Sequence, residues 1–218
     1  MTAFPSPNHG ARRGGVAPSL IVLHYTGMAT YAEARARLCD PLHEVSAHWL
    51  LSDEGEAEAL VDEGQRAWHA GAGSWGAVTD INSASIGVEM QNPGDRPYPQ
   101  AQMAGLERLL TGIMARWGIG AAGVIGHSDM APTRKRDPGP RFDWRRLALQ
   151  GMSVWPVAQE APVAAFYGAL RRFGYGDGPE ADVLTAFRLR FRPMVTGPVD
   201  AVDAGAAVDL ARRYGTGQ

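Results

Sequence analysis

Three short apolar segments of this chain each lead to a side chain that can bind or release a proton. Residues 20–23 precede His24, residues 85–88 precede Glu89, and residues 123–125 lead through Gly126 to His127. Short apolar runs rich in β-branched residues are typical of strands buried on both faces. A chain built this way is constrained to a sheet covered on both sides, with polar side chains gathered where its strands end.

Helical segments alternate with these strands. Apolar residues recur at helical spacing from Met103 to Trp117, and Gly118 follows as a stop signal. Thr30 and Glu33 have the spacing of a capping box at the start of another helix. The alternation predicts an α/β fold with a mixed central sheet flanked by helices, followed by a small three-helix C-terminal domain.

Changes in composition divide the chain. Residues 1–17 are predicted to be an irregular N-terminal arm, 18–150 a catalytic domain, and 151–162 a linker with two prolines and no periodicity. Residues 163–218 are predicted to form the C-terminal domain. Its three helical patterns cover 163–173, 180–191 and 199–214.

Composition narrows the possible partners. The net charge of -2 argues against non-specific binding to nucleic acid or to an anionic membrane surface, and no apolar run is long enough for membrane insertion. Cys39 is the single cysteine, so an intrachain disulfide is impossible. The chain as given has no visible signal peptide and is expected in the cytoplasm, or in the periplasm or envelope if a leader was removed.

The loop of residues 126–139 carries the strongest sign of chemistry, and its two glycines and two prolines predict irregular structure. His127 opens it and Asp137 follows ten positions later, directly before Pro138. With His24 from the other strand end, two imidazoles and a carboxylate would leave one tetrahedral position open, which is the pattern of a catalytic zinc site. The alternative is that each histidine is an ordinary strand-end residue bonded to backbone. His43 and His48 do not form a second site of this kind, because they are five residues apart where one helical face requires four.

Two charged side chains are candidates for catalysis. Glu89, flanked by apolar residues, could be a general base with a raised pKa, or could be exposed on an edge or salt-bridged to an arginine. Lys135 could stabilise an oxyanion, or could belong with Arg134 and Arg136 to a solvated run of charge. Trp68 and His69 could line a groove for a sugar or peptide, or could simply pack within their loop.

Five motifs in order resemble the zinc-dependent N-acetylmuramoyl-L-alanine amidase type 2 family, which is related to the peptidoglycan recognition proteins. The motifs are Ile21-Val22-Leu23-His24-Tyr25-Thr26, Val45-Ser46-Ala47-His48-Trp49, Trp68-His69-Ala70-Gly71, Ser85-Ile86-Gly87-Val88-Glu89, and Gly126-His127-Ser128-Asp129 through Lys135-Arg136-Asp137-Pro138-Gly139. The resemblance implies one Zn²⁺ per chain on His24, His127 and Asp137, a general acid/base at Glu89 and a transition-state lysine at Lys135. Tyr25, His69 and Arg134 are candidates for substrate binding.

The implied reaction is hydrolysis of the amide between the lactyl group of N-acetylmuramic acid, or of its 1,6-anhydro form, and L-alanine. The expected partner is therefore peptidoglycan or a muropeptide. The C-terminal residues resemble a three-helix peptidoglycan-binding module, but Arg188 stands where a glutamine is usual. The main alternative is a non-catalytic peptidoglycan recognition protein, against which the presence of all three zinc ligands argues. A metallopeptidase acting on the stem peptide is a second alternative.

Overall fold

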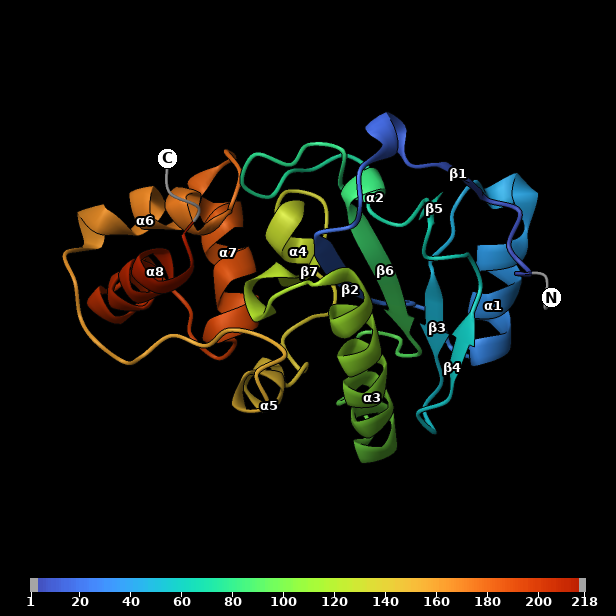
Figure 1. The fold of residues 1–218 in the computed structure, drawn as a ribbon. Coiled ribbons are helices and arrows are strands. Elements are labelled where there is room, and N and C mark those ends of the chain that lie inside the picture. Colours follow the sequence, from blue (N-terminus) through green and yellow to red (C-terminus); the bar gives the residue numbers. More distant parts are fainter. Residues whose placement is uncertain (1–3, 216–218) are drawn as a thin grey trace.

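A five-stranded mixed sheet forms the centre of the molecule in the computed structural model, which describes residues 4–215 (Figure 1). Its strand order is β4-β3-β6-β2-β7, with β3, β6, β2 and β7 parallel and β4 antiparallel at the edge. The strands are β2 (Leu20–Tyr25), β3 (Trp49–Leu51), β4 (Ala57–Ala59), β6 (Ser85–Met90) and β7 (Val124–Gly126). The predicted α/β class and mixed sheet are confirmed.

Helices cover both faces of this sheet. The α-helices of the described residues are α1 (Tyr31–Cys39), α2 (Ile81–Ala84), α3 (Gln100–Trp117), α4 (His127–Met130), α5 (Trp144–Leu149), α6 (Phe166–Phe173), α7 (Glu180–Phe191) and α8 (Ala201–Tyr214). The expected capping box of Thr30 and Glu33 begins α1, and Gly118 ends α3 with a left-handed backbone, as predicted.

Alternate residues of β2 enter different cores. Ile21 and Leu23 pack in one apolar cluster with α3 residues such as Leu106, whereas Val22 packs on the other side of the sheet with Phe187 of α7. A strand with apolar residues on both faces requires two cover layers, and this chain supplies them from its middle and from its C-terminal end.

The C-terminal helices are packed onto the sheet. Phe166, Phe187 and Leu210 belong to the same apolar cluster as Ile125 of β7. Residues 152–162 contain no helix or strand and connect the two parts (Figure 1). The domain boundaries at residues 150 and 163 stay a prediction, and the last three residues of the C-terminal range lie outside the described part.

Two local expectations were wrong. The arm of residues 1–17 is not irregular throughout: β1 (His9–Ala11) pairs with β5 (Gln65–Ala67), although residues 1–3 lie outside the described part. Arg12 follows, only 8% exposed, and donates to the carbonyls of Ser83 and Glu63. In addition, the loop of residues 126–139 begins with the helical turn α4. Among residues 4–215, no helix is both long and apolar enough to cross a bilayer.

Candidate metal centre and substrate pocket

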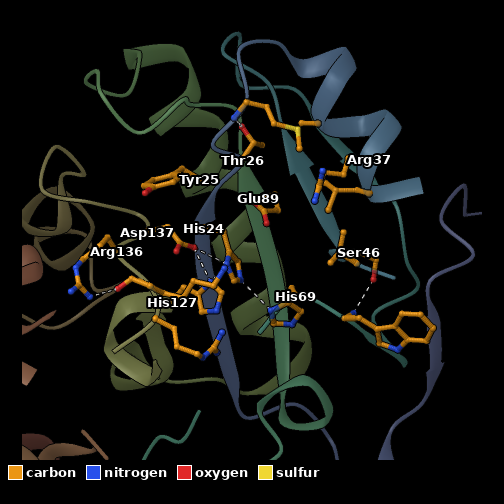
Figure 2. Close-up of a pocket in the computed structure, with 17 residues that line it drawn as sticks. His24, Tyr25, Thr26, Arg37, Ser46, His69, Glu89, His127, Arg136 and Asp137 are labelled. Atoms are coloured by element: carbon orange, nitrogen blue, oxygen red, sulfur yellow. Dashed lines mark hydrogen bonds and ion pairs between the residues drawn. The ribbon is translucent and has the colours of Figure 1, made fainter. Parts of the chain in front are cut away.

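The three predicted metal ligands meet at one end of the sheet. His24 lies near the end of β2, and His127 is the first residue after β7, the strand beside it. Asp137 returns from the loop that follows α4. Its backbone carbonyl accepts a hydrogen bond from the N–H of Ser128, which holds this part of the loop beside the start of α4. The parallel pairing of β2 and β7 explains why side chains 103 positions apart come together (Figure 2).

Their polar atoms are unusually close. The Nδ1 atoms of His24 and His127 are 2.9 Å apart, and each lies 2.9 Å from Oδ2 of Asp137. His24 is 1% exposed, His127 3% and Asp137 6%. Within the described residues these three form the one group of histidine, cysteine or acidic side chains close enough to hold a metal ion.

Hydrogen bonds on the far side of each ring determine which nitrogen carries the proton. His127 Nε2 lies 2.9 Å from the carbonyl oxygen of Ala70, which can only accept, so this nitrogen carries hydrogen. His24 Nε2 lies 3.1 Å from Nδ1 of His69. His69 Nε2 in turn lies 3.2 Å from Oγ of Ser85, whose own hydrogen goes to the carbonyl of Ile81. His24 Nε2–H therefore donates to His69 Nδ1, and His69 Nε2–H donates to Oγ of Ser85.

This arrangement leaves three acceptors facing one another. Burial and the neighbouring His127 lower the pKa of His24 to about 4, so its ring is neutral near pH 7. With Nε2 protonated, the Nδ1 lone pair of each histidine points at the Asp137 carboxylate. Such a group is stable only with a cation among its members, and two imidazole nitrogens with one carboxylate oxygen are a donor set that zinc accepts. The residues present therefore fit a metal ion.

Glu89 lies beside this group. It is the register partner of His24 on β6, so both side chains leave the same face of the sheet, and Figure 2 shows them entering the same pocket. Burial, and secondarily the negative charge of Asp137, raise the pKa of Glu89 well above its usual value. Its Oε2 is buried and has no hydrogen-bond partner. A carboxylate held in this way can exchange a proton with a molecule bound in front of it.

The other predicted site residues line the same pocket, a cavity of about 470 Å³. Lys135 and the half-buried Tyr25 form part of its wall. The guanidinium of Arg134 donates to the carbonyls of Ala70 and Ala72 and so braces the segment that holds His127. His69 also reaches the pocket, but both of its ring nitrogens are already occupied.

One positively charged residue of the pocket, Arg37, was not predicted from the sequence. Arg37 of α1 lines the pocket and is exposed, and Figure 2 shows it on the wall that also carries Ser46, away from Asp137. A single arginine on an exposed helix face gives no sequence signal of its own. Its place on the pocket wall depends on how α1 packs against the sheet.

Comparison with known proteins agrees with this geometry. Residues 14–140 match the family described as N-acetylmuramoyl-L-alanine amidase. The chain is 34% identical to the N-acetylmuramoyl-L-alanine amidase AmiD of Escherichia coli (strain K12), over 90% of this chain and 83% of that protein. It is 33% identical to the 1,6-anhydro-N-acetylmuramyl-L-alanine amidase AmpD of Enterobacter cloacae, over 66% of this chain and 86% of that protein.

Solved structures give the same result. The E. coli AmiD complex with anhydro-N-acetylmuramic acid-L-Ala-D-gamma-Glu-L-Lys superposes with a TM-score of 0.84 at 32% identity, covering 94% of this chain and 93% of that one. AmpDh3 from Pseudomonas aeruginosa with an anhydromuramic pentapeptide gives a TM-score of 0.83 at 27% identity, covering 99% and 100%. The family match spans more than half of this chain, and the chain belongs to the N-acetylmuramoyl-L-alanine amidase family.

Proposed function

We propose that this chain uses one Zn²⁺ to hydrolyse the amide between the lactyl group of a muramic acid and L-alanine, in peptidoglycan or its fragments. The observation that carries the proposal is the meeting of three acceptor atoms, from His24, His127 and Asp137, within 2.9 Å of one another on a pocket wall. Glu89, a half-buried residue whose Oε2 is buried and unpaired, lies beside them and supplies the proton transfer that amide hydrolysis needs.

The zinc would be held by Nδ1 of His24, Nδ1 of His127 and Oδ2 of Asp137. When bound, it would lower the pKa of a water molecule towards about 7 and polarise the scissile carbonyl. The carboxylate of Glu89 accepts a proton from the attacking water and passes it to the leaving nitrogen of L-alanine. Proton transfer to this nitrogen is essential, because an amide anion is too basic to leave.

Lys135 stabilises the charge that develops on the carbonyl oxygen. It lines the pocket, and no hydrogen bond or ion pair of its ammonium group is seen among the described residues, so the group is free to donate to substrate. A donor placed beside an oxyanion within a protein pocket contributes more than the same donor in bulk solvent.

The remaining pocket residues would hold the substrate. Tyr25 offers a ring face to sugar or peptide, and Arg134 shapes the wall through the carbonyls of Ala70 and Ala72. His69 keeps its place in the pocket wall but acts chiefly on His24, because both of its nitrogens are used within the protein.

Arg37 would bind the stem peptide. The peptide in the AmiD complex contains a γ-linked D-glutamate, and a γ-link leaves the α-carboxylate of that residue free. An exposed guanidinium on the pocket wall, with no ion pair among the described residues, fits such a carboxylate. Substrates carrying either the 1,6-anhydro or the ordinary muramic sugar are included in the proposal.

Mass spectrometry of muropeptides after incubation with the zinc-loaded protein tests this function. The proposal predicts a free sugar and an intact stem peptide that begins with L-alanine. A shortened stem peptide would indicate a metallopeptidase instead. Substrate that is bound but unchanged would indicate a non-catalytic recognition protein and would overturn the proposal.

A further inference from the structure

The carboxylate of Asp129 forms a buried junction between the predicted metal loop and the C-terminal helices. Asp129 is the third residue of α4, two positions after His127, and is 0% exposed. Its Oδ1 accepts the hydroxyl of Tyr175 at 2.5 Å. Its Oδ2 accepts Nη1 of Arg190 at 2.7 Å and the backbone N–H of Gly126 at 2.8 Å. Two of these three donors come from chain segments 46 and 61 residues away.

Arg190 of α7 holds the chain on both sides of His127. Besides Asp129, its guanidinium donates to the carbonyl of Val124, three residues before His127, at 3.0 Å. It also donates to Oγ of Ser153 at 3.1 Å. Its carbon Cζ lies 4.3 Å from the centre of the Trp144 ring. An arginine only 2% exposed thus fixes the end of β7 and the turn of α4 together.

Tyr175 is the second support. Burial raises the pKa of its hydroxyl well above the usual value, so the group stays protonated and donates to Asp129. Its ring packs edge-on against Trp75, 5.1 Å between centroids, in the core shared by the sheet and the C-terminal helices. Removal of the hydroxyl alone would therefore leave the ring packing in place.

The α4 turn needs support of this kind. A helix of four residues is not stable by itself, because the cost of nucleation exceeds the gain from its few hydrogen bonds. The first residue of this turn is His127, whose Nδ1 must be held within a few tenths of an ångström of its position for a metal to bind well. Contacts from outside the loop must supply that precision.

We propose that the C-terminal helices position the metal ligand His127, through the hydrogen bonds of Tyr175 and Arg190 to Asp129. The proposal rests on the proposed zinc function of the same loop. It gives this part of the chain a role in the metal centre that does not depend on binding to the wall polymer. Tyr175 and Arg190 are positioning residues, since neither touches the metal group.

The test compares Tyr175→Phe and Arg190→Met with a matched control in α7, the helix that carries Arg190. Arg188 of α7 is 6% exposed and forms a buried ion pair with Asp203, away from the metal loop. Arg188→Met therefore removes an equivalent buried pair without touching Asp129. Circular dichroism establishes conditions in which each full-length variant is folded, and competition with a chelator measures its zinc dissociation constant.

We expect zinc binding to weaken about 10- to 100-fold in Arg190→Met, as for other residues that orient metal ligands. The loss should be smaller in Tyr175→Phe, about threefold, because one hydrogen bond is removed and the ring packing is kept. Arg188→Met should bind zinc within twofold of the wild type. Equal loss of affinity in Arg190→Met and Arg188→Met would mean a general effect on the fold and would overturn the proposal. If Arg190→Met does not fold, Tyr175→Phe decides: an unchanged dissociation constant then refutes the positioning role.

Amide hydrogen exchange on the metal-free chain separates this inference from the proposed function. The N–H groups of Gly126 and Ser128 are bonded to Asp129 and Asp137. They should exchange faster in Tyr175→Phe and at the wild-type rate in Arg188→Met. If the wild type bound no zinc but exchange still followed this pattern, the metal function would be wrong while the support of the loop stood. Unchanged exchange in Tyr175→Phe would refute the support itself.

Discussion

Replacement of His69 by alanine tests the chain of hydrogen bonds behind the predicted zinc ligand His24. His69 accepts the Nε2–H of His24 at 3.1 Å, and His24 is 1% exposed. In His69→Ala this N–H loses its only acceptor among the described residues, and an unpaired buried donor costs about 1–3 kcal/mol. Because His69 is only half-buried in the pocket wall, water can replace part of the lost bond.

The expected loss of zinc-binding free energy is therefore near the lower end of this range, about 1.4 kcal/mol. It corresponds to a zinc dissociation constant about tenfold larger than that of the wild type. Chelator competition measures the constant directly, and turnover at saturating zinc shows whether the site still works once loaded. Most of the activity should return at high zinc, because His69 does not touch the metal group. A dissociation constant within twofold of the wild type would refute the orienting role of His69.

Gly87 supplies an independent check on the same chain. A Cβ at this position would lie 2.4 Å from Cγ of His69, so Gly87→Ala must displace the imidazole ring. We expect Gly87→Ala to weaken zinc binding when His69 is present and to add little in the His69→Ala background. Simple additivity of the two changes in a double-mutant cycle would show that Gly87 acts by another route.

Four further predictions concern other residues. Glu89→Gln should bind zinc normally but lose about 10²–10⁴-fold in kcat, and near-full turnover would eliminate Glu89 as the base. Lys135→Met should lower kcat about 10²-fold or more with little change in zinc affinity, measured on the same preparations. Arg37→Gln should raise KM several-fold for muropeptides with a free D-glutamate α-carboxylate and leave KM unchanged for α-amidated ones. Burial lowers the pKa of His48 to about 4, below its ordinary 6.5. The free energy of unfolding of the metal-free wild type should therefore fall by up to about 3 kcal/mol, relative to that of His48→Gln, as the pH falls from 6.5 to 4. Urea titrations measure this difference.

The sign of the last prediction follows from which state binds the proton. Below pH 6.5 the unfolded chain protonates His48, whereas the folded chain does so only near pH 4. In the folded state His48 accepts the N–H of Gly87 on Nδ1, which leaves its Nε2–H for the carbonyl of Gln65. Protonation would lose the bond from Gly87 and place a second positive charge beside Arg12. The contribution of neutral His48 to stability is therefore fully present above the pKa of this residue in the unfolded chain. It is lost as the pH falls towards the pKa in the folded chain.

Much of the fold could be predicted from local sequence because local physics determines those elements. The buried runs at 20–25 and 85–90 and the helical periodicity before Trp117 each identify one element without reference to the rest of the chain. The pairing of β1 with β5 could not be predicted in this way. Both strands have three residues and no alternating pattern, and their partnership depends on contacts between positions more than 50 residues apart.

The α4 turn illustrates a second limit. Glycine, proline and charge in residues 126–139 favoured irregular structure, and locally that expectation was reasonable. In the structure, Asp129 of this turn receives hydrogen bonds from Tyr175 and Arg190, which lie in a different part of the chain. No signal within the loop could indicate those partners.

The residues of the candidate site also fall into those that local sequence predicts and those that depend on distant contacts. Sequence alone placed His24, Glu89 and His127 at strand ends, and parallel pairing was enough to bring them together. The sequence could not assign a role to His69, because the residues around it would look the same whether its ring bound a sugar or oriented another histidine. That distinction depends on a 3.1 Å contact across 45 residues of chain.

The geometry of His24 and His127 shows why the sheet alone does not make a metal site. Pairing of β2 with β7 brings the two rings together, but it does not choose which nitrogen faces inward. Adjacent residues make that choice: His69 takes the Nε2–H of His24, and the carbonyl of Ala70 takes the Nε2–H of His127. If His24 lost this partner, the tautomer with hydrogen on Nδ1 would become accessible, and its N–H would donate to Asp137 in place of a metal bond. The segment beside the pocket is therefore as necessary to a high-affinity site as the strands that carry the ligands.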